Sequence, residues 1–159
     1  MTETALEFRA TSPSPFGLLE ITERDDAIVR LTWPARGPEV EPPTPLLEAA
    51  TRQLQEYFDG HRQDFDLPLR VEAAEFERAV CEQMRAIPFG ETCTYGDIAK
   101  ALATAAQPVG RACGANPIPI IIPCHRVLGA DGLGGFSASG GVEDKVWLLK
   151  HEGAAGLLI

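Results

Sequence analysis

The segment from Asn116 to Val127 constrains this chain more than any other. It reads Asn-Pro-Ile-Pro-Ile-Ile-Ile-Pro-Cys-His-Arg-Val, so prolines interrupt an otherwise β-branched apolar run. Proline fixes φ and removes a backbone donor, which excludes an ordinary central strand. We predict a stiff, buried, irregular extended segment that carries Cys124 at its end. A reactive thiol needs such a rigid mount, with a base or a positive charge nearby.

The whole sequence predicts an α+β chain with two domains, 1–70 and 71–159. Alternating apolar residues indicate short strands at 5–10, 17–23 and 27–33, followed by a loop at 34–43 that is rich in proline and glycine. Thr44 and Pro45 then begin a helix that ends at Gly60. The first domain is therefore an antiparallel sheet with one helix, which we interpret as a support, and residues 64–70 cross to the second domain.

The second domain is predicted to be mainly helical. Residues 72–86 form a helix whose apolar face holds Phe76, Val80, Met84 and Ile87. Thr94 caps a helix over 95–103, with Asp97 completing a capping box. A short turn leads to a second helix over 108–115, and this pair has helix-turn-helix geometry. A glycine-rich segment, 129–141, is expected to be a mobile active-site loop before a last helix from residue 142.

The second helix of the pair has unusually small side chains. Glycine costs about 1 kcal/mol relative to alanine inside a helix, so Gly110 and Gly114 need a reason. Close helix packing is one explanation. The other is that a slim helix must enter a narrow groove of DNA, the minor groove.

Composition excludes several classes of protein. No apolar run approaches the roughly 20 residues of a membrane span, and the first residues have no signal-peptide character. The four cysteines, at 81, 93, 113 and 124, form no Cys-x-x-Cys pair. We therefore expect no membrane association, no metal, no cofactor and a reducing, cytoplasmic location. Cys81 and Cys93 are expected to be core residues.

The net charge of the chain argues against DNA binding. The chain carries 14 basic and 23 acidic residues, a net charge of −9, and both halves are acidic. Proteins that bind a polyanion usually carry the opposite sign. If this chain binds DNA, it does so through a local surface and with little long-range steering.

The segment at 116–127 resembles the signature of the O6-alkylguanine-DNA alkyltransferases, which move an alkyl group from guanine O6 to their own cysteine. Further motifs that are similar to this family follow in the family's order along nearly the whole chain: Ser14-Pro15-Phe16-Gly17-Leu18-Leu19, residues 53–69, Ile87-Pro88-Phe89-Gly90-Glu91-Thr92, Thr94-Tyr95-Gly96 and Trp147-Leu148-Leu149 with His151-Glu152-Gly153. The resemblance implies single-turnover repair by a monomer that flips the damaged base out of double-stranded DNA.

The same resemblance assigns catalytic roles. Cys124 is the acceptor, His125 takes its proton through a water, and Glu152 orients the histidine. Tyr95 donates a proton or a hydrogen bond to the leaving base, and Asn116 ties the turn that precedes the cysteine segment. Successive strand residues face opposite sides, so adjacent Cys124 and His125 require a bridging water or a local bend.

The resemblance also implies a surface for the minor groove and the flipped O6-alkylguanine. Its residues are Gln107, Pro108, Val109, Gly110, Arg111, Cys113, Gly114 and Ala115, with Ser137 or Ser139 contacting O6. Family members usually carry an arginine where this chain has Gln107, so we expect weak binding to duplex DNA. Arg126 is expected to be a structural ion-pair partner.

Three alternatives stay open. A lesion sensor of the same fold would bind DNA without transfer, although such proteins usually replace the cysteine. A cysteine hydrolase would need an oxyanion hole and turnover of esters or amides. An interaction protein would fit the acidic charge but leave the Cys-His string unexplained.

Overall fold

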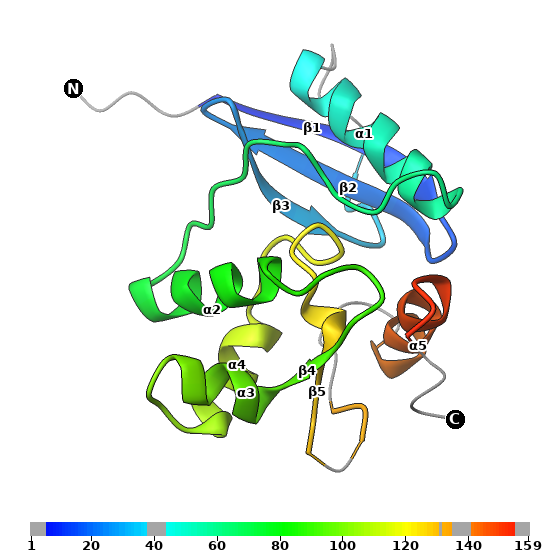
Figure 1. The fold of residues 1–159 in the computed structure, drawn as a ribbon. Helices are drawn as coiled ribbons and strands as arrows, with labels where there is room; N and C mark the ends of the chain where they lie inside the picture. Colours follow the sequence, from blue (N-terminus) through cyan, green and yellow to red (C-terminus); the bar gives the residue numbers. More distant parts are fainter. Residues whose placement is uncertain (1–5, 38–43, 131, 135–140, 155–159) are drawn as a thin grey trace, which may run out of the picture. The chain divides into compact units, whose positions relative to one another are not determined.

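The computed structural model describes residues 6–37, 44–130, 132–134 and 141–154 (Figure 1). They belong to two units, Met1–Val71 and Glu72–Ile159. The α+β class is confirmed, because the first unit contains an antiparallel sheet with a helix and the second is mainly helical. None of the helices in the described ranges has the length and apolar character that a membrane span requires.

In the first unit, the strands β1 (Glu7–Ser14), β2 (Gly17–Arg24) and β3 (Ala27–Thr32) pair in that order. Helix α1 (Pro45–Phe58) packs against the sheet, as Figure 1 shows. The face of α1 that is buried is mostly apolar. Thr44 caps it as predicted, since its side chain accepts a hydrogen bond of 3.1 Å from the Leu47 N–H. The chain then returns to β3, where the Ile28 N–H donates to the Pro68 carbonyl.

The first strand differs from its prediction. We expected residues 5–10, with Pro13 in a turn, but β1 continues to Ser14 and pairs Pro13 with Leu18. The sheet order explains the difference, because β1 pairs only with β2 among the described strands and an edge strand tolerates a residue that cannot donate a hydrogen bond.

The second unit surrounds one short turn. Its elements are α2 (Glu75–Arg85), β4 (Cys93–Thr94), α3 (Tyr95–Ala101), α4 (Ala106–Gly114), the 3₁₀ turn η1 (Cys124–Arg126), β5 (Val127–Leu128) and α5 (Gly141–His151). Helices α3 and α4 pack as the expected helix-turn-helix, α2 packs on α4, and both α2 and α5 contact η1 (Figure 1). Strands β4 and β5 form a parallel pair. The 3₁₀ turn with Cys124 therefore lies at the centre of this unit.

The capping box that begins α3 is confirmed. The Asp97 N–H donates to Thr94 Oγ1 at 3.0 Å, and the Thr94 N–H donates to Asp97 Oδ2 at 2.9 Å. The helix ends two residues earlier than predicted, because Ala103 adopts a left-handed φ of 55° and Thr104 donates to the Ala99 carbonyl. This is a Schellman-type ending with alanine in the place where glycine is usual.

Other boundaries move by one to three residues. Helix α2 begins at Glu75 rather than 72, α4 begins at Ala106 rather than 108, and α5 begins at Gly141. Two burial predictions need correction. Phe76, assigned to the apolar face of α2, is 37% exposed, and Cys93 is half-buried rather than a core residue. Cys81 is buried in α2 as expected.

Candidate active site around Cys124

The segment that leads to Cys124 is a compact turn rather than an extended run. The Ile122 N–H donates to the Ile118 carbonyl at 2.9 Å, and Ile120 has a φ of 73°. A β-branched residue rarely adopts this left-handed conformation, so the surrounding contacts must hold it there. The segment is buried and irregular as predicted, but "extended" was wrong, because the prolines terminate a strand without specifying the turn that replaces it.

Asn116 holds this turn together. Its Nδ2 donates to the Ile122 carbonyl at 2.9 Å, and its Oδ1 accepts from the Ile118 N–H at 3.0 Å. The Ile122 carbonyl also accepts from the Cys124 N–H at 2.8 Å. One amide side chain thus bridges both ends of the turn and sets the position from which Cys124 begins.

Cys124, His125 and Arg126 are successive residues of the 3₁₀ turn η1, and all three are buried. In a 3₁₀ turn neighbouring side chains diverge by about a third of a turn rather than by half. The local bend that the adjacent pair requires is therefore present in the backbone.

His125 is held by Glu152, which α5 places behind it. The His125 Nε2 and Glu152 Oε2 atoms are 2.8 Å apart, and both side chains are fully buried. Among the described residues, the other ring nitrogen, Nδ1, has no hydrogen-bond partner. Burial lowers the pKa of His125, against the opposing effect of the Glu152 hydrogen bond. The resting imidazole is neutral, so one nitrogen remains able to accept a proton.

Arg126 completes the environment of Glu152. Its Nε donates to Glu152 Oε1 at 2.8 Å, one terminal nitrogen donates to Oε2 at 3.0 Å, and the other donates to the Ile87 carbonyl at 2.6 Å. Burial alone would raise the pKa of Glu152, but the hydrogen bonds and charges of His125 and Arg126 lower it to about 2. Arg126 is the structural ion-pair partner that the sequence predicted.

Cys124 is buried, with 8% of the residue exposed, and burial raises the pKa of its thiol to about 11. A hydrogen bond from the Asn116 side chain and the charge of Lys145 act in the opposite direction. The resting cysteine is therefore a thiol. A thiol needs a base to become a nucleophile, and the neutral imidazole of His125 is the next side chain in the sequence.

Lys145 is a site residue that the sequence analysis missed. Its side chain on α5 is fully buried, and Nζ donates to the Val127 carbonyl at 2.7 Å and to the Leu133 carbonyl at 2.5 Å. Nζ also lies 6.0 Å from the centre of the Tyr95 ring. Burial lowers the pKa of Lys145 to about 8, opposed by nearby Cys124 and Cys113. The sequence does hold a clue, because Lys145 precedes Leu148 and Leu149 at helical spacing on the buried face of α5.

Tyr95, the first residue of α3, lies directly against the glycine-rich segment. A Cβ at Gly134 would stand 2.9 Å from Tyr95 Cε2, 3.0 Å from Tyr95 Oη and 3.0 Å from the Gly129 nitrogen. The φ of Gly134 is 70°. Only glycine allows the backbone to pass this close to the phenol, which lies beside the Lys145 ammonium.

We expect Gly134→Ala to lower the free energy of unfolding by roughly 1–3 kcal/mol, from the left-handed φ and the contacts with Tyr95. It should also slow reaction at Cys124, because the displaced backbone moves Tyr95. Urea unfolding measures the first effect, and the rate of iodoacetamide alkylation of Cys124 measures the second. The control is Gly37→Ala, since a Cβ at Gly37 meets nothing within 4 Å. If Gly134→Ala and Gly37→Ala had the same unfolding free energy and the same reactivity at Cys124, the requirement for glycine at position 134 would be contradicted.

Comparison with known proteins decides the family. The model "6-O-methylguanine DNA methyltransferase, ribonuclease-like domain" matches residues 8–71, and "6-O-methylguanine DNA methyltransferase, DNA binding domain" matches residues 75–154. The methylated-DNA–protein-cysteine methyltransferase of Metallosphaera sedula is 39% identical over 145 residues, which cover 91% of this chain and 92% of that relative. The chain belongs to the methylated-DNA–protein-cysteine methyltransferase family.

Other members of the methyltransferase family are similarly close. The protein of Mycolicibacterium paratuberculosis is 40% identical over 156 residues, or 92% of each chain. The crystal structure of Mycobacterium tuberculosis O6-methylguanine methyltransferase is 33% identical, with a TM-score of 0.83 over 94% of both chains. A structure of the Mycobacterium tuberculosis protein in complex with DNA is 36% identical, with a TM-score of 0.80 over 91% of both.

In this methyltransferase chain, helix α4 exposes most of the residues that we assigned to DNA. The outer face carries Gln107, Pro108, Gly110, Arg111, Gly114 and Ala115. Val109 and Cys113 require correction, because they are buried on the inner face and hold α4 in its unit. Ser137 and Ser139 lie outside the described residues.

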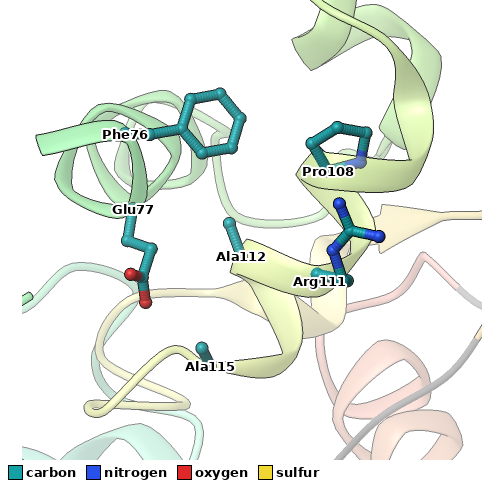
Figure 2. A pocket seen from close by; sticks show the side chains of 6 residues that line it. All are labelled: Phe76, Glu77, Pro108, Arg111, Ala112 and Ala115. Atoms are coloured by element: carbon teal, nitrogen blue, oxygen red, sulfur yellow. The ribbon is translucent and has the colours of Figure 1, made fainter. Parts of the chain in front are cut away.

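A shallow pocket of about 330 Å³ lies between α2 and α4. Figure 2 shows its lining residues, which are Phe76, Glu77, Pro108, Arg111, Ala112 and Ala115. It is separate from the cysteine, the histidine and the glutamate described above. Within the described ranges, no three histidine, cysteine or acidic side chains are grouped so that they could hold a metal ion.

Proposed function

We propose that this chain repairs O6-alkylguanine in double-stranded DNA by a single transfer of the alkyl group to Sγ of Cys124. One observation carries the proposal. His125 stands directly after the buried Cys124, its Nε2 is held by the ionised Glu152, and its Nδ1 has no partner among the described residues. This is the cysteine–histidine–acid arrangement of an activated nucleophile.

Activation begins from an uncharged pair. The thiol of Cys124 and the imidazole of His125 are both neutral, as the directions of their pKa shifts require. His125 Nδ1 takes the thiol proton through a bridging water. Glu152, already ionised, stabilises the imidazolium that results, and the Lys145 ammonium stabilises the thiolate. The reactive form therefore arises as an ion pair inside the site, where each charge has a fixed partner.

Transfer is an in-line displacement. The bond from sulfur to the alkyl carbon forms as the bond from that carbon to guanine O6 breaks, and the electron pair stays on the guanine. Tyr95 donates a proton or a hydrogen bond to the leaving base, and the proton held by His125 restores neutrality. The product is a thioether, which has no good leaving group for water to displace, so each Cys124 reacts once.

Access to the reacting carbon requires base flipping, because O6 is hidden in the stacked duplex. Helix α4 supports an approach from the minor groove. A Cβ at Gly110 would meet nothing within 4 Å, so this face of α4 has room for the backbone of DNA to approach. One thiol serves one flipped base, and a monomer is sufficient for the reaction.

The decisive experiment measures intact protein mass after incubation with an O6-methylguanine oligonucleotide, single-stranded or duplex. We expect one methyl group to be gained, and none in Cys124→Ala. The matched control is Cys93→Ala, which removes a half-buried thiol and should react like the parent chain. Lesion binding without any mass gain would contradict transfer and favour a lesion sensor of the same fold.

A further inference from the structure

The second unit has few cations that could meet DNA. Residues 72–159 contain seven basic and ten acidic residues. Two of the basic side chains are buried, since Arg126 bonds to Glu152 and Lys145 bonds to backbone carbonyls. Arg85 forms an ion pair of 3.2 Å with Glu82. A DNA contact must therefore depend on a small number of remaining charges.

Arg111 is the cation on the outer face of α4. It stands four residues after Gln107, so the two side chains share one face of the helix, one turn apart. Helical side chains lean toward the N-terminus, and Figure 2 shows the Arg111 guanidinium directed toward Pro108 at the start of α4. Gly110 beside it adds no side chain that could cover it.

The charge opposite Arg111 is Glu77 of α2, on the other side of the pocket. Figure 2 shows the guanidinium directed away from the Glu77 carboxylate. No ion pair within 4.0 Å joins Arg111 to an acidic group among the described residues. The guanidinium therefore keeps donors for an external anion, while Glu77 repels any anion that enters the pocket.

We propose that Arg111 is the phosphate-binding residue of α4 and supplies, from one turn later in the helix, the positive charge that Gln107 does not bring. The inference rests on the proposed function only in taking α4 as the helix that meets DNA. A guanidinium binds phosphate through two parallel N–H donors. The ligand is a phosphate of the DNA backbone, so the contact orients the duplex without reading its sequence.

The test is equilibrium binding to an unmodified DNA duplex over a range of KCl concentrations, which needs no chemistry at Cys124. We expect Arg111→Ala to weaken binding about tenfold and to reduce the slope of log K against log salt by about 0.9, the value for one lost phosphate contact. The matched control is Arg52→Ala, which makes the same change in net charge at an exposed position of α1. Its slope should stay at the parent value.

Two further variants test the geometry. Glu77→Gln should tighten binding through loss of a repulsive charge at the same pocket. In the Arg111→Ala background, Gln107→Arg should restore the lost slope, because it returns a cation to the start of α4. Together these changes would locate the phosphate contact on the face of α4 that carries Gln107 and Arg111.

The proposal is overturned if Arg111→Ala and Arg52→Ala leave the same salt slope. Transfer of the alkyl group from a free O6-alkylguanine base, which has no phosphate, separates a phosphate contact of Arg111 from a role at Cys124. A loss of that activity in the variant would assign Arg111 to the cysteine site and overturn the phosphate role. Failure of the parent chain to accept an alkyl group would contradict the proposed repair function and leave the binding result intact.

Discussion

Replacing Glu152 by alanine is expected to lower the free energy of unfolding by roughly 3–5 kcal/mol and to abolish alkyl transfer. The carboxylate accepts two hydrogen bonds from Arg126 and contacts His125. Its removal leaves a buried guanidinium with only the Ile87 carbonyl among the partners described above, and leaves the imidazole without a group that orients it. Chemical denaturation and intact-mass measurements follow the two losses.

Glu152→Gln separates charge from shape. The amide keeps the volume and can still accept from Arg126, so it should fold more stably than the alanine variant. It carries no charge to stabilise a protonated His125, and its transfer rate should stay low. Recovery of transfer in Glu152→Gln would show that the carboxylate charge has no part in activating Cys124.

Glu152 also predicts the acid sensitivity of the fold. Its pKa is about 2 in the folded chain against an ordinary value of 4.5. A carboxylate with a lowered pKa contributes stability above its unfolded pKa, and this contribution is lost as the pH falls toward the folded value. The loss should amount to about 3 kcal/mol between pH 4.5 and 2. Glu152→Gln should show a shallower decline over that range.

Replacing Lys145 by methionine is expected to slow reaction at Cys124 by about tenfold or more at neutral pH. The ammonium lowers the pKa of the Cys124 thiol, and one pKa unit changes the thiolate fraction tenfold. The variant also loses the hydrogen bonds to Val127 and Leu133, which hold β5 and the start of the glycine-rich segment. Iodoacetamide alkylation of Cys124 as a function of pH reports the thiol pKa directly.

The effect of Lys145 on the reactivity of Cys124 should depend on pH. Its pKa is about 8, so the parent chain itself loses the positive charge as the pH rises through that value. The difference in thiolate reactivity between the parent chain and Lys145→Met should therefore shrink above pH 8. Lys150→Met, on the exposed side of the same helix, is the control. Identical profiles for Lys145→Met and the parent would exclude an electrostatic role for Lys145.

Stability should respond less than reactivity to the loss of Lys145. Methionine leaves two carbonyl groups without their donor, at a cost of about 1–3 kcal/mol each. It also removes a buried charge, whose desolvation penalty opposes that cost. A large fall in reactivity with a small change in unfolding free energy would fit this balance.

Local sequence determined several parts of this protein because short-range physics governs them. The Thr94 and Asp97 capping box joins side chains to backbone groups three residues away, so the start of α3 needs no tertiary information. Thr44 and Pro45 begin α1 for the same kind of reason. The Pro-Cys-His-Arg-Val string was specific enough to indicate the family, and the comparisons confirmed that family.

The arrangement of the charged site was decided by tertiary structure. His125 and Arg126 meet Glu152 only because α5 packs on η1, and 26 or 27 residues separate these partners in the sequence. In the sequence, Lys145 looks like an ordinary helical lysine. Only the folded structure shows that its Nζ donates hydrogen bonds to the carbonyls of Val127 and Leu133. The left-handed conformation of Ile120 could not be predicted either, because the local propensity of a β-branched residue disfavours it. Contacts between distant segments supply the free energy that compensates for burying these charges and for the strained backbone of Ile120. These contacts cannot be deduced from the order of the residues.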